Sequence, residues 1–500
     1  MRIADVLAAA ALVTITIGAP SASEAERAVR VGSKKFTESV ILGEIATQLA
    51  ASTGVDARHR AELGGTRLLW SALVSGEVDV YPEYTGTLRY EIFAGHDLPT
   101  DEDLADELAR AGIGMTPALG FNNTYAIGMQ APKALALRVK TITDLAEFDE
   151  LEIAFTNEFM DREDGWPGLR RHYRLPHMRV VGLDHDLAYR GLLSGRIDAT
   201  DLYSTDAEIQ HYDLAILEDD KDYFPEYRAV LLYRLDFARE APEVLTALER
   251  LAGTLPDDTM IDLNVRSKIY HQPEPQIAAS FLRQALGIIP TTEPTAQTSR
   301  LWSDTAAHLQ LVGLSLFAAI IVALPLGMLA AKRRRVGRVI LAVVGIVQTI
   351  PALALLVFMV PVLGIGAAPA LAALFLYSLL PIVRNTYTGL TDISPSILEA
   401  ADAMGLAAID RLRLIEMPMA SRSILAGIKT SAVINIGTAT LGALIGAGGY
   451  GQPILTGIRL NDTMLILQGA VPAAVLALVV QLLFDLSDRI FVPRGLRLEG

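Results

Sequence analysis

The sequence predicts two parts of different fold class. An α/β part with two similar lobes comes first, and an all-α part that crosses a membrane about five times follows it. Three observations predict this arrangement. Residues 29–290 alternate strand-like and helix-like segments, a pattern typical of α/β domains. A short motif recurs 119 residues apart within that part. Residues 301–500 contain four long stretches without any Asp, Glu, Lys or Arg.

Charge and cysteine content narrow the function classes. The chain carries a formal net charge of −14, and the excess of acidic residues lies in residues 1–300, with 47 Asp and Glu against 29 Lys and Arg. An acidic first part argues against nucleic acid as a partner. The chain has no cysteine, which excludes disulfides, thiolate metal sites and cysteine nucleophiles. Its histidines and carboxylates show no spacing typical of a metal site or a catalytic triad, so we expect neither.

The N-terminus resembles an export signal over residues 1–25. Arg2 precedes an apolar stretch from Val6 to Ala19, and small residues from Ser21 to Ala25 follow it. The apolar stretch is short for a membrane span. A signal that remains uncleaved as an anchor is the alternative, and it would leave the topology unchanged.

The start of the α/β part predicts four elements in order. A strand ends near Gly32, a helix covers Thr37 to Ala50, and a second strand covers Val55 to Glu62. Gly64-Gly65-Thr66 then opens a helix that continues to Val74. Free backbone N–H groups and the positive end of the helix dipole make such a start a possible seat for a carboxylate. An ordinary helix N-cap is the alternative.

The internal repeat predicts two lobes of similar fold. Residues 73–79 (LVSGEVD) are matched by residues 192–198 (LLSGRID), and each copy is followed five residues after its Asp by a tyrosine, Tyr84 and Tyr203. Each copy is typical of a helix, a glycine turn, a short strand and a loop. Ligands of open α/β sheets bind at such strand ends, and two lobes can close around a ligand. We therefore expect the two tyrosines to face one crevice.

The second part contains enough uncharged sequence for five spans. The charge-free stretches are residues 305–331, 339–383, 430–458 and 463–484, and the second is long enough for two spans. Gly364, Gly366 and Pro369 mark the turn inside it. Pro351 is expected to kink the second helix, because proline removes a helix hydrogen bond. The predicted helices lie near 308–331, 339–362, 368–388, 424–446 and 463–485.

The distribution of positive charge predicts the orientation. Basic residues follow the first helix (332–338), lie between the third and fourth helices (384–422) and follow the fifth (489–497), whereas the opposite loops contain only Arg459. The first helix therefore enters from outside, and the loop around Glu399 and the C-terminus are cytoplasmic. An exported N-terminal part agrees with this orientation.

Polar residues in the fourth helix admit two interpretations. Asn435, Thr438 and Thr440 cost free energy in a membrane unless they pair or face a pathway. Close helix packing through small residues is the other interpretation. Five helices enclose little space, so we expect a translocation path at a symmetric interface, and hence a homodimer.

The loop between the third and fourth helices resembles the coupling loop of ABC-importer permeases. The resemblance consists of Glu399-Ala400-Ala401, then Gly405, Ile415 and Pro418, although Met417 stands where leucine is commoner. It implies an all-α type I importer permease that docks on a separate ABC ATPase, one copy for each of two permeases. The chain has no Walker A motif. ATP is therefore expected on the partner subunit, with no catalytic residue and no cofactor on this chain.

The first part resembles the substrate-binding proteins of glycine betaine, carnitine and choline (osmoprotectant) importers. The resemblance implies a two-lobed α/β periplasmic binding protein fold of type II-like topology, fused here to its permease. It also implies that several tyrosines surround a quaternary ammonium group, which aromatic faces stabilise because it cannot donate a strong hydrogen bond. The motifs are residues 31–38 (VGSKKFTE), 63–66 (LGGT), 81–87 (YPEYTGT), 122–125 (NNTY) and 201–206 (DLYSTD).

The resemblance carries over to individual residues. Tyr84, Tyr125 and Tyr203 match cage positions, and Tyr223 is placed less securely. A betaine carboxylate is expected at Thr66, Thr87 or Thr37. Many relatives have glutamine where this chain has Ser39, which leaves one polar contact, and with it the exact solute, open.

These observations predict an importer subunit of the bacterial inner membrane that joins receptor and permease for quaternary ammonium solutes. Ergothioneine, a trimethylammonium derivative, is an alternative solute. A ligand-gated channel and a membrane-anchored sensor are alternatives of another class. The predicted segments are a signal peptide (1–25), a binding domain (26–292; lobe one 29–126 and 228–290, lobe two 127–227), a linker (293–304), a permease domain (305–490) with coupling loop 395–418, and a cytoplasmic tail (491–500).

Overall fold

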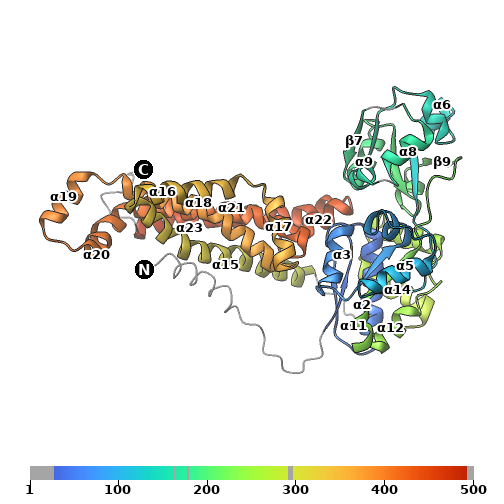
Figure 1. The fold of residues 1–500 in the computed structure, drawn as a ribbon, viewed down its shortest axis with the longest axis horizontal. Coiled ribbons are helices and arrows are strands. Elements are labelled where there is room, and N and C mark those ends of the chain that lie inside the picture. The colour runs from blue at the N-terminus through green and yellow to red at the C-terminus, as the bar shows by residue number, and fades with distance from the viewer. Residues whose placement is uncertain (1–27, 163, 177–178, 291–296, 492–500) are drawn as a thin grey trace. The chain divides into compact units, whose positions relative to one another are not determined.

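The computed structural model describes residues 28–162, 164–176, 179–290 and 297–491. Contacts divide the chain into two compact units. One comprises the described residues within 27–295 together with 456–463, and the other those within 296–455 and 464–500. The proposed signal peptide and nearly all of the proposed tail lie outside the described residues. Figure 1 shows the elements of both units.

The first unit contains two five-stranded mixed sheets, one in each lobe, which confirms the predicted two-lobed α/β fold. The strand order is β2-β1-β3-β10-β4 in the first sheet and β7-β6-β8-β5-β9 in the second. The strands of the first sheet are β1 (Val29–Gly32), β2 (Ala57–Arg60), β3 (Val80–Tyr84), β4 (Ile113–Met115) and β10 (Ala229–Arg234). Those of the second are β5 (Tyr125–Gln130), β6 (Ile153–Thr156), β7 (Val180–Leu183), β8 (Ala199–Tyr203) and β9 (Leu214–Leu217).

The two sheets have the same pairing pattern. In each, three neighbouring strands are parallel, and the next two pairings are antiparallel. The repeated motif occupies the same place in both. Asp79 and Asp198 each donate their backbone N–H to a carbonyl of the neighbouring strand's start, Arg30 at 2.8 Å and Glu152 at 2.7 Å. Each aspartate carboxylate accepts the backbone N–H of that same residue, at 2.9 and 3.0 Å. The repeated aspartates therefore hold strands together.

Helices cover both sheets. The first predicted helices are confirmed as α2 (Thr37–Ala51) and α3 (Thr66–Val74). Helix α2 is buried almost throughout and packs against three helices from the end of the unit, so sequence far apart forms one core. The others in lobe one are α4 (Thr85–Thr87), π-helical η1 (Leu88–Ile92), α5 (Asp101–Arg110), α11 (Leu235–Glu240), α12 (Pro242–Glu249), α13 (Asp257–Lys268) and α14 (Glu274–Leu286). Those in lobe two are α6 (Ala131–Leu137), 3-10 helix η2 (Thr143–Glu147), α7 (Asn157–Asp161), α8 (Trp166–Tyr173), α9 (His185–Leu193) and α10 (Glu208–His211).

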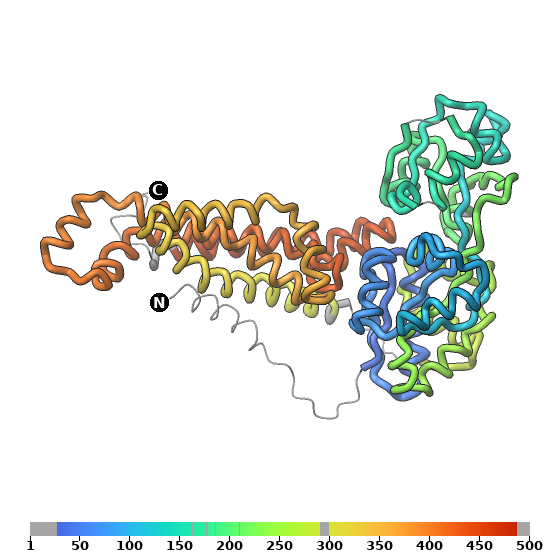
Figure 2. Tube along the Cα trace, in the orientation of Figure 1, coloured from blue at the N-terminus to red at the C-terminus, as the bar shows by residue number. Residues whose placement is uncertain are grey.

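The chain crosses between the lobes twice, before β5 and before β10. Figure 2 traces it from the blue lobe through the green lobe and back. The two crossings are bonded to each other. Asn122 and Arg228 form an antiparallel bridge, the Asn123 N–H donates to the Tyr227 carbonyl at 3.1 Å, and the Thr124 hydroxyl donates to the Pro225 carbonyl at 2.9 Å. The lobes are thus joined by a short hydrogen-bonded ribbon.

A short segment from later in the chain belongs to the same unit. Residues 456–463 include the end of α22 (Gly451–Arg459). The Arg459 guanidinium is buried and lies 2.6 Å from the Glu62 carboxylate and 2.8 Å from the Glu274 carboxylate. Because these two carboxylates favour its charged form, the pKa of Arg459 is raised although burial alone would lower it.

The second unit is all-α, as predicted. By length and composition, four helices can each cross a membrane, or up to five spans exist if one bent pair counts as a span. The elements are α15 (Gln297–Lys332), α16 (Arg334–Thr349), α17 (Ala352–Leu363), α18 (Ala367–Thr391), α19 (Pro395–Ala403), α20 (Ala408–Arg411), π-helical η3 (Leu412–Glu416), α21 (Met417–Thr438), 3-10 helix η4 (Ala439–Ile445), α22 and α23 (Thr463–Phe491).

Pro351 does more than kink the predicted second helix. It separates α16 from α17, and the two are bent by 98°. Proline supplies no N–H for the helix ladder, and the Ile350 carbonyl just before it accepts a hydrogen bond from the Tyr377 hydroxyl of α18. The predicted turn after α17 is confirmed, with Gly364 and Gly366 both at positive φ.

Helix α18 forms the centre of this unit, between α15 and α21. Asn435 of α21 is fully buried, and its side-chain amide donates to the hydroxyls of Ser315 (3.1 Å) and Ser378 (2.8 Å) on the two neighbouring helices. Of the two interpretations offered for this residue, its contacts support helix packing. In helix α23, in contrast, only 6% of the most apolar stretch is buried within the structure.

Candidate functional site

The aromatic residues of the predicted site meet between the lobes. Tyr203 at the end of β8 and Tyr125 at the start of β5 have ring centroids 5.3 Å apart. Phe36, just before α2 in lobe one, lies 5.9 Å from Tyr203 and 6.2 Å from Tyr84 at the end of β3. Tyr84 and Tyr203, the matched residues of the repeat, are therefore linked through Phe36. We call these four side chains, Phe36, Tyr84, Tyr125 and Tyr203, the aromatic cluster.

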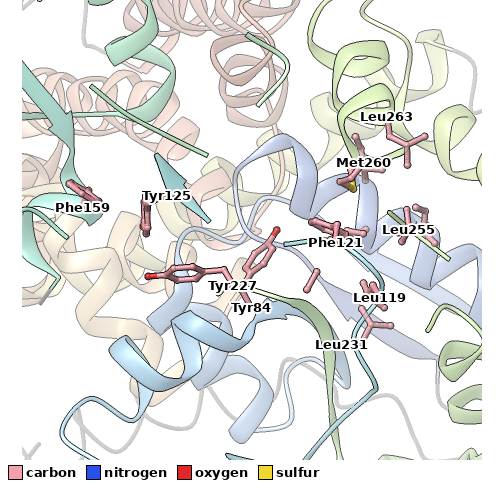
Figure 3. Close-up of a cluster of buried hydrophobic side chains, with 14 of the residues drawn as sticks. Tyr84, Leu119, Phe121, Tyr125, Phe159, Tyr227, Leu231, Leu255, Met260 and Leu263 are labelled. Carbon is pink, nitrogen blue, oxygen red and sulfur yellow. The ribbon is translucent and has the colours of Figure 1, made fainter. Parts of the chain in front are cut away.

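Further aromatic rings extend the cluster on the side of Tyr125. Phe159 of α7 is 4.9 Å from Tyr125, and Tyr227 is 5.4 Å away in an edge-on arrangement. Figure 3 shows Tyr84, Tyr125, Tyr227 and Phe159 in this region, three of them on elements of the two lobes and Tyr227 in the crossing before β10. Residues 36, 159 and 227 were not among the sequence-predicted ligands. The only sequence signal for Phe36 was its place in the motif of residues 31–38 (VGSKKFTE).

Tyr223 lies outside the aromatic cluster. Its ring is 5.2 Å from Phe224, and Phe224 in turn is 6.3 Å from Tyr125. The Tyr223 hydroxyl donates to the Gly165 carbonyl at 3.1 Å. Among the four predicted cage residues, the structure thus brings three together through Phe36 and leaves Tyr223 behind Phe224.

Internal cations already lie near two of the rings. The Lys34 ammonium is 5.5 Å from the Tyr84 centroid, and the Arg162 guanidinium carbon is 5.7 Å from the centroids of Tyr125 and Tyr227. Both cations have carboxylate partners, Glu83 at 2.5 Å and Asp164 at 2.5 Å. Tyr203 stacks on His185 instead, at 4.7 Å. Tyr203 is also only half-buried, so its ring, on lobe two, is the more accessible to a solute.

A buried carboxylate, Glu38, contacts Tyr84 of the aromatic cluster and joins the two lobes. Glu38 Oε1 accepts from the Tyr84 hydroxyl (2.6 Å) and the Asn123 amide (2.8 Å). Glu38 Oε2 accepts from the Thr205 hydroxyl (2.6 Å) and the Asn264 amide (3.0 Å). Burial raises the pKa of Glu38, and these hydrogen bonds oppose that rise. The carboxylate thus fixes the Tyr84 ring and ties α2 of lobe one to the loop after β8 in lobe two.

The three predicted threonines differ in their surroundings. Thr66 opens α3 and Thr87 ends α4, and both are buried. Within the described residues, neither hydroxyl forms a hydrogen bond, and neither residue lines the interlobe cavity described below. The Thr37 hydroxyl accepts from Arg459 at 3.1 Å. The Ser39 hydroxyl accepts the Lys34 backbone N–H at 2.9 Å and is fully buried, which gives that residue a structural role.

A cavity of about 80 Å³ lies between the lobes beside Phe36 and Tyr203. It is lined from lobe one by Lys34, Lys35, Phe36, Gly64 and Gly65, and from lobe two by Thr156, Asn157, Glu158, Leu183, Asp184, His185 and Tyr203. The predicted carboxylate seat at the start of α3 therefore borders this cavity. The described residues contain no group of three or more His, Cys, Asp or Glu that could hold a metal ion.

The loop that resembles a coupling loop forms a helix pair at the other unit's surface. Glu399 and Ala400 are exposed on α19, Gly405 follows with φ +76°, Ile415 lies in η3 and Pro418 is in the first turn of α21. Arg411 of α20 binds Asp402 at 2.6 Å and Glu416 at 2.8 Å, which holds the pair together. Exposed apolar side chains, among them Met404, Ile409 and Leu414, accompany it.

The fold and the site together define a solute-binding domain joined to a membrane transport domain. Residues 27–284 match the family described as substrate binding domain of ABC-type glycine betaine transport system. Residues 323–496 match the family described as binding-protein-dependent transport system inner membrane component. The chain therefore belongs to the ABC-type glycine betaine transport family, with binding domain and permease in one polypeptide. It is a multi-pass inner-membrane protein.

Curated relatives match each part. The choline transport system permease protein OpuBB of Bacillus subtilis is 39% identical over 193 residues, which are 39% of this chain and 89% of that protein. The glycine betaine/carnitine/choline transport system permease protein OpuCD of the same organism is 45% identical over 179 residues, 36% of this chain and 78% of that protein.

One relative combines permease and binding protein in its name. The ergothioneine transport permease/ergothioneine binding protein EgtU of Helicobacter pylori is 32% identical over 271 residues, 53% of this chain and 48% of that protein. Among solved structures, the crystal structure of a glycine betaine/carnitine/choline ABC transporter has 24% identity and a TM-score of 0.45, and it covers 51% of this chain and 98% of its own.

Proposed function

We propose that this chain captures a quaternary ammonium solute outside the membrane and conducts it through its own permease domain, driven by a separate ATPase. The observation that carries the proposal is the aromatic cluster, because rings from both lobes converge beside an interlobe cavity. A trimethylammonium group interacts with such faces by about 0.5–2 kcal/mol for each ring. The choline and glycine betaine relatives support the same class of solute.

Within this proposal the residues have separate roles. Tyr203, Tyr125 and Tyr84 surround the cation together with Phe36. The free hydroxyls of Thr66 and Thr87 bind the polar end of the solute. Thr37 and Tyr223 are weaker members of the site, because Arg459 and the Gly165 carbonyl engage their hydroxyls.

The distribution of basic residues and the loop around Glu399 support the proposed orientation and docking of the membrane part. The basic residues of 332–338 and 384–422 favour a cytoplasmic loop with Glu399, an extracytoplasmic binding domain and a cytoplasmic tail. Residues 1–25 serve as the export signal, and 293–304 link the domains. The exposed pair α19–α20 is the ATPase-docking element of the 305–490 permease domain, through Glu399, Ala400, Gly405, Ile415 and Pro418. Two ATPase copies serve a permease homodimer. The exposed surface of α23, which is sparsely buried within one chain, can form part of the dimer interface.

Calorimetry on the purified full-length chain in lipid nanodiscs tests the receptor function. The probes are choline, glycine betaine, carnitine, proline betaine and ergothioneine. We expect at least one to bind, and Tyr203→Ala to weaken that binding about tenfold, since the loss of one cation–π face and its packing is worth about 1–2 kcal/mol. If none of the five binds the unmodified chain, the proposed function is wrong.

Ergothioneine is the second candidate solute, because the relative that bears that name also joins permease and binding protein. The same titration separates it from the osmoprotectants. Uptake into cells that are depleted of ATP distinguishes an importer from a channel and from a sensor. An importer loses accumulation, a channel still equilibrates the solute across the membrane, and a sensor moves none.

A further inference from the structure

Glu158 brings a carboxylate to the wall of the interlobe cavity. It lies on α7, directly after β6, because the Thr156 hydroxyl accepts the Phe159 N–H at 3.3 Å and so starts that helix. The side chain is exposed and lines the cavity. Its Oε1 lies 3.2 Å from the position that a Cβ atom on Gly65 would occupy, so the carboxylate reaches across to the start of α3 in lobe one.

The same carboxylate acts on the aromatic cluster. Burial raises the pKa of Tyr203 and of Tyr125, and the negative charge of Glu158 adds to the rise in both. Because Glu158 and Tyr203 line the same cavity, a cation held against the Tyr203 ring would lie near this carboxylate. Glu158 is thus placed between the cluster and Gly65.

The charged side chains that line the cavity differ in whether they have a partner of opposite charge. Lys34 pairs with Glu83 at 2.5 Å, Lys35 pairs with Asp184 at 2.9 Å, and His185 faces Asp206 at 3.1 Å. Each basic group that lines the cavity therefore has a carboxylate partner. Glu158, in contrast, has no hydrogen bond or ion pair with its side chain among the residues that the structure describes. Among the described residues that line the cavity, Glu158 is therefore a carboxylate without a paired cation.

We propose that Glu158 is a specificity-determining residue that makes the site prefer net-cationic trimethylammonium alcohols over trimethylammonium carboxylates. The inference rests on the proposed function and names the solute class within it. A cationic solute neutralises Glu158, whereas a zwitterion brings a second carboxylate to the start of α3, where Glu158 already lies. Two unit charges about 6 Å apart in a medium of dielectric constant roughly 40 interact strongly enough to change affinity about tenfold.

Glu158→Gln tests the assignment, because it removes the charge and keeps the size of the side chain. Binding of choline, glycine betaine and the neutral choline analogue 3,3-dimethylbutanol is measured by calorimetry on the full chain in nanodiscs. Glu147→Gln is the matched control, since Glu147 is an exposed glutamate of the same lobe that does not line the cavity.

We expect Glu158→Gln to weaken choline about tenfold, to leave 3,3-dimethylbutanol unchanged and to leave or strengthen glycine betaine. The choline-to-betaine affinity ratio then falls about tenfold or more, while Glu147→Gln leaves it unchanged. An unchanged ratio in Glu158→Gln overturns the role of Glu158 and leaves the proposed function intact. The absence of all binding in the unmodified chain overturns the proposed function itself. Circular dichroism and retained analogue binding show that the variant is folded.

Discussion

Removal of the Glu38 carboxylate should loosen the connection between the two lobes. Four donors converge on this side chain, which is 3% exposed. In Glu38→Ala the Thr205 hydroxyl can rotate toward another acceptor, and the Asn264 amide keeps its bond to the Thr205 carbonyl at 3.0 Å. The Tyr84 hydroxyl and the Asn123 amide lose Glu38 Oε1, the acceptor that they share.

The expected loss follows from these two donors. A buried donor without an acceptor costs about 1–3 kcal/mol of stability. The variant also no longer buries a charge, which offsets part of this cost. We therefore expect a net loss of about 3 kcal/mol for the two donors together. Glu38→Gln should cost only about 1 kcal/mol. Its carbonyl can still serve Tyr84 and Asn123, and its amide can donate to the Thr205 hydroxyl.

Hydrogen exchange on the full chain, read by mass spectrometry, measures the effect locally. Protected amides of α2 and α13 should exchange about 100-fold faster in Glu38→Ala, and about fivefold faster in Glu38→Gln. Glu249→Ala, an exposed glutamate of α12, is the control and should leave these rates unchanged. Exchange in Glu38→Ala within twofold of the unmodified chain would refute the reasoning.

Three further outcomes are expected. Burial raises the pKa of Asp201 to about 6 against 3.8 in an unfolded chain. Between these pH values the native state binds one proton more than the unfolded state, so the free energy of unfolding falls by up to about 3 kcal/mol from pH 4 to pH 6. Asp201→Asn should lose this pH dependence in hydrogen-exchange measurements, and an identical pH dependence in the variant would contradict the reasoning. Asn435→Leu should destabilise the second unit by about 1–3 kcal/mol, since the two serine hydroxyls lose their donor, and unchanged melting of the detergent-solubilised protein would count against a packing role. Gly405→Asp should abolish ATP-driven uptake while solute binding persists, because Gly405 has φ +76° and lies between α19 and α20, the helices proposed to dock the ATPase; normal uptake would exclude that loop as the docking element.

The sequence predicted features that depend on local pattern. The repeat located the ends of β3 and β8, and charge-free stretches located the membrane helices, since both signals are carried by neighbouring residues. Pairings over long sequence distances could not be predicted. Phe36 joins the aromatic cluster only because α2 of lobe one meets the loop after β8. Likewise, no local signal indicates that Arg459 lies between Glu62 and Glu274, or that Tyr377 satisfies the carbonyl at the Pro351 break.

The bonded ribbon between the lobes divides the aromatic rings by how far a rotation of the lobes would displace them. Tyr125 is the first residue after one crossing and Tyr227 lies within the other, so a rotation of the lobes about the ribbon displaces these rings little. Tyr203 pairs with Tyr125 in the second sheet and stays beside it, whereas Phe36, on lobe one, would separate from Tyr203. Under the proposed function, a solute would rest first on Tyr125 and Tyr203 and be enclosed afterwards by Phe36. Affinity for an open form and lifetime in a closed form would then depend on different residues, so that mutations would change one without the other.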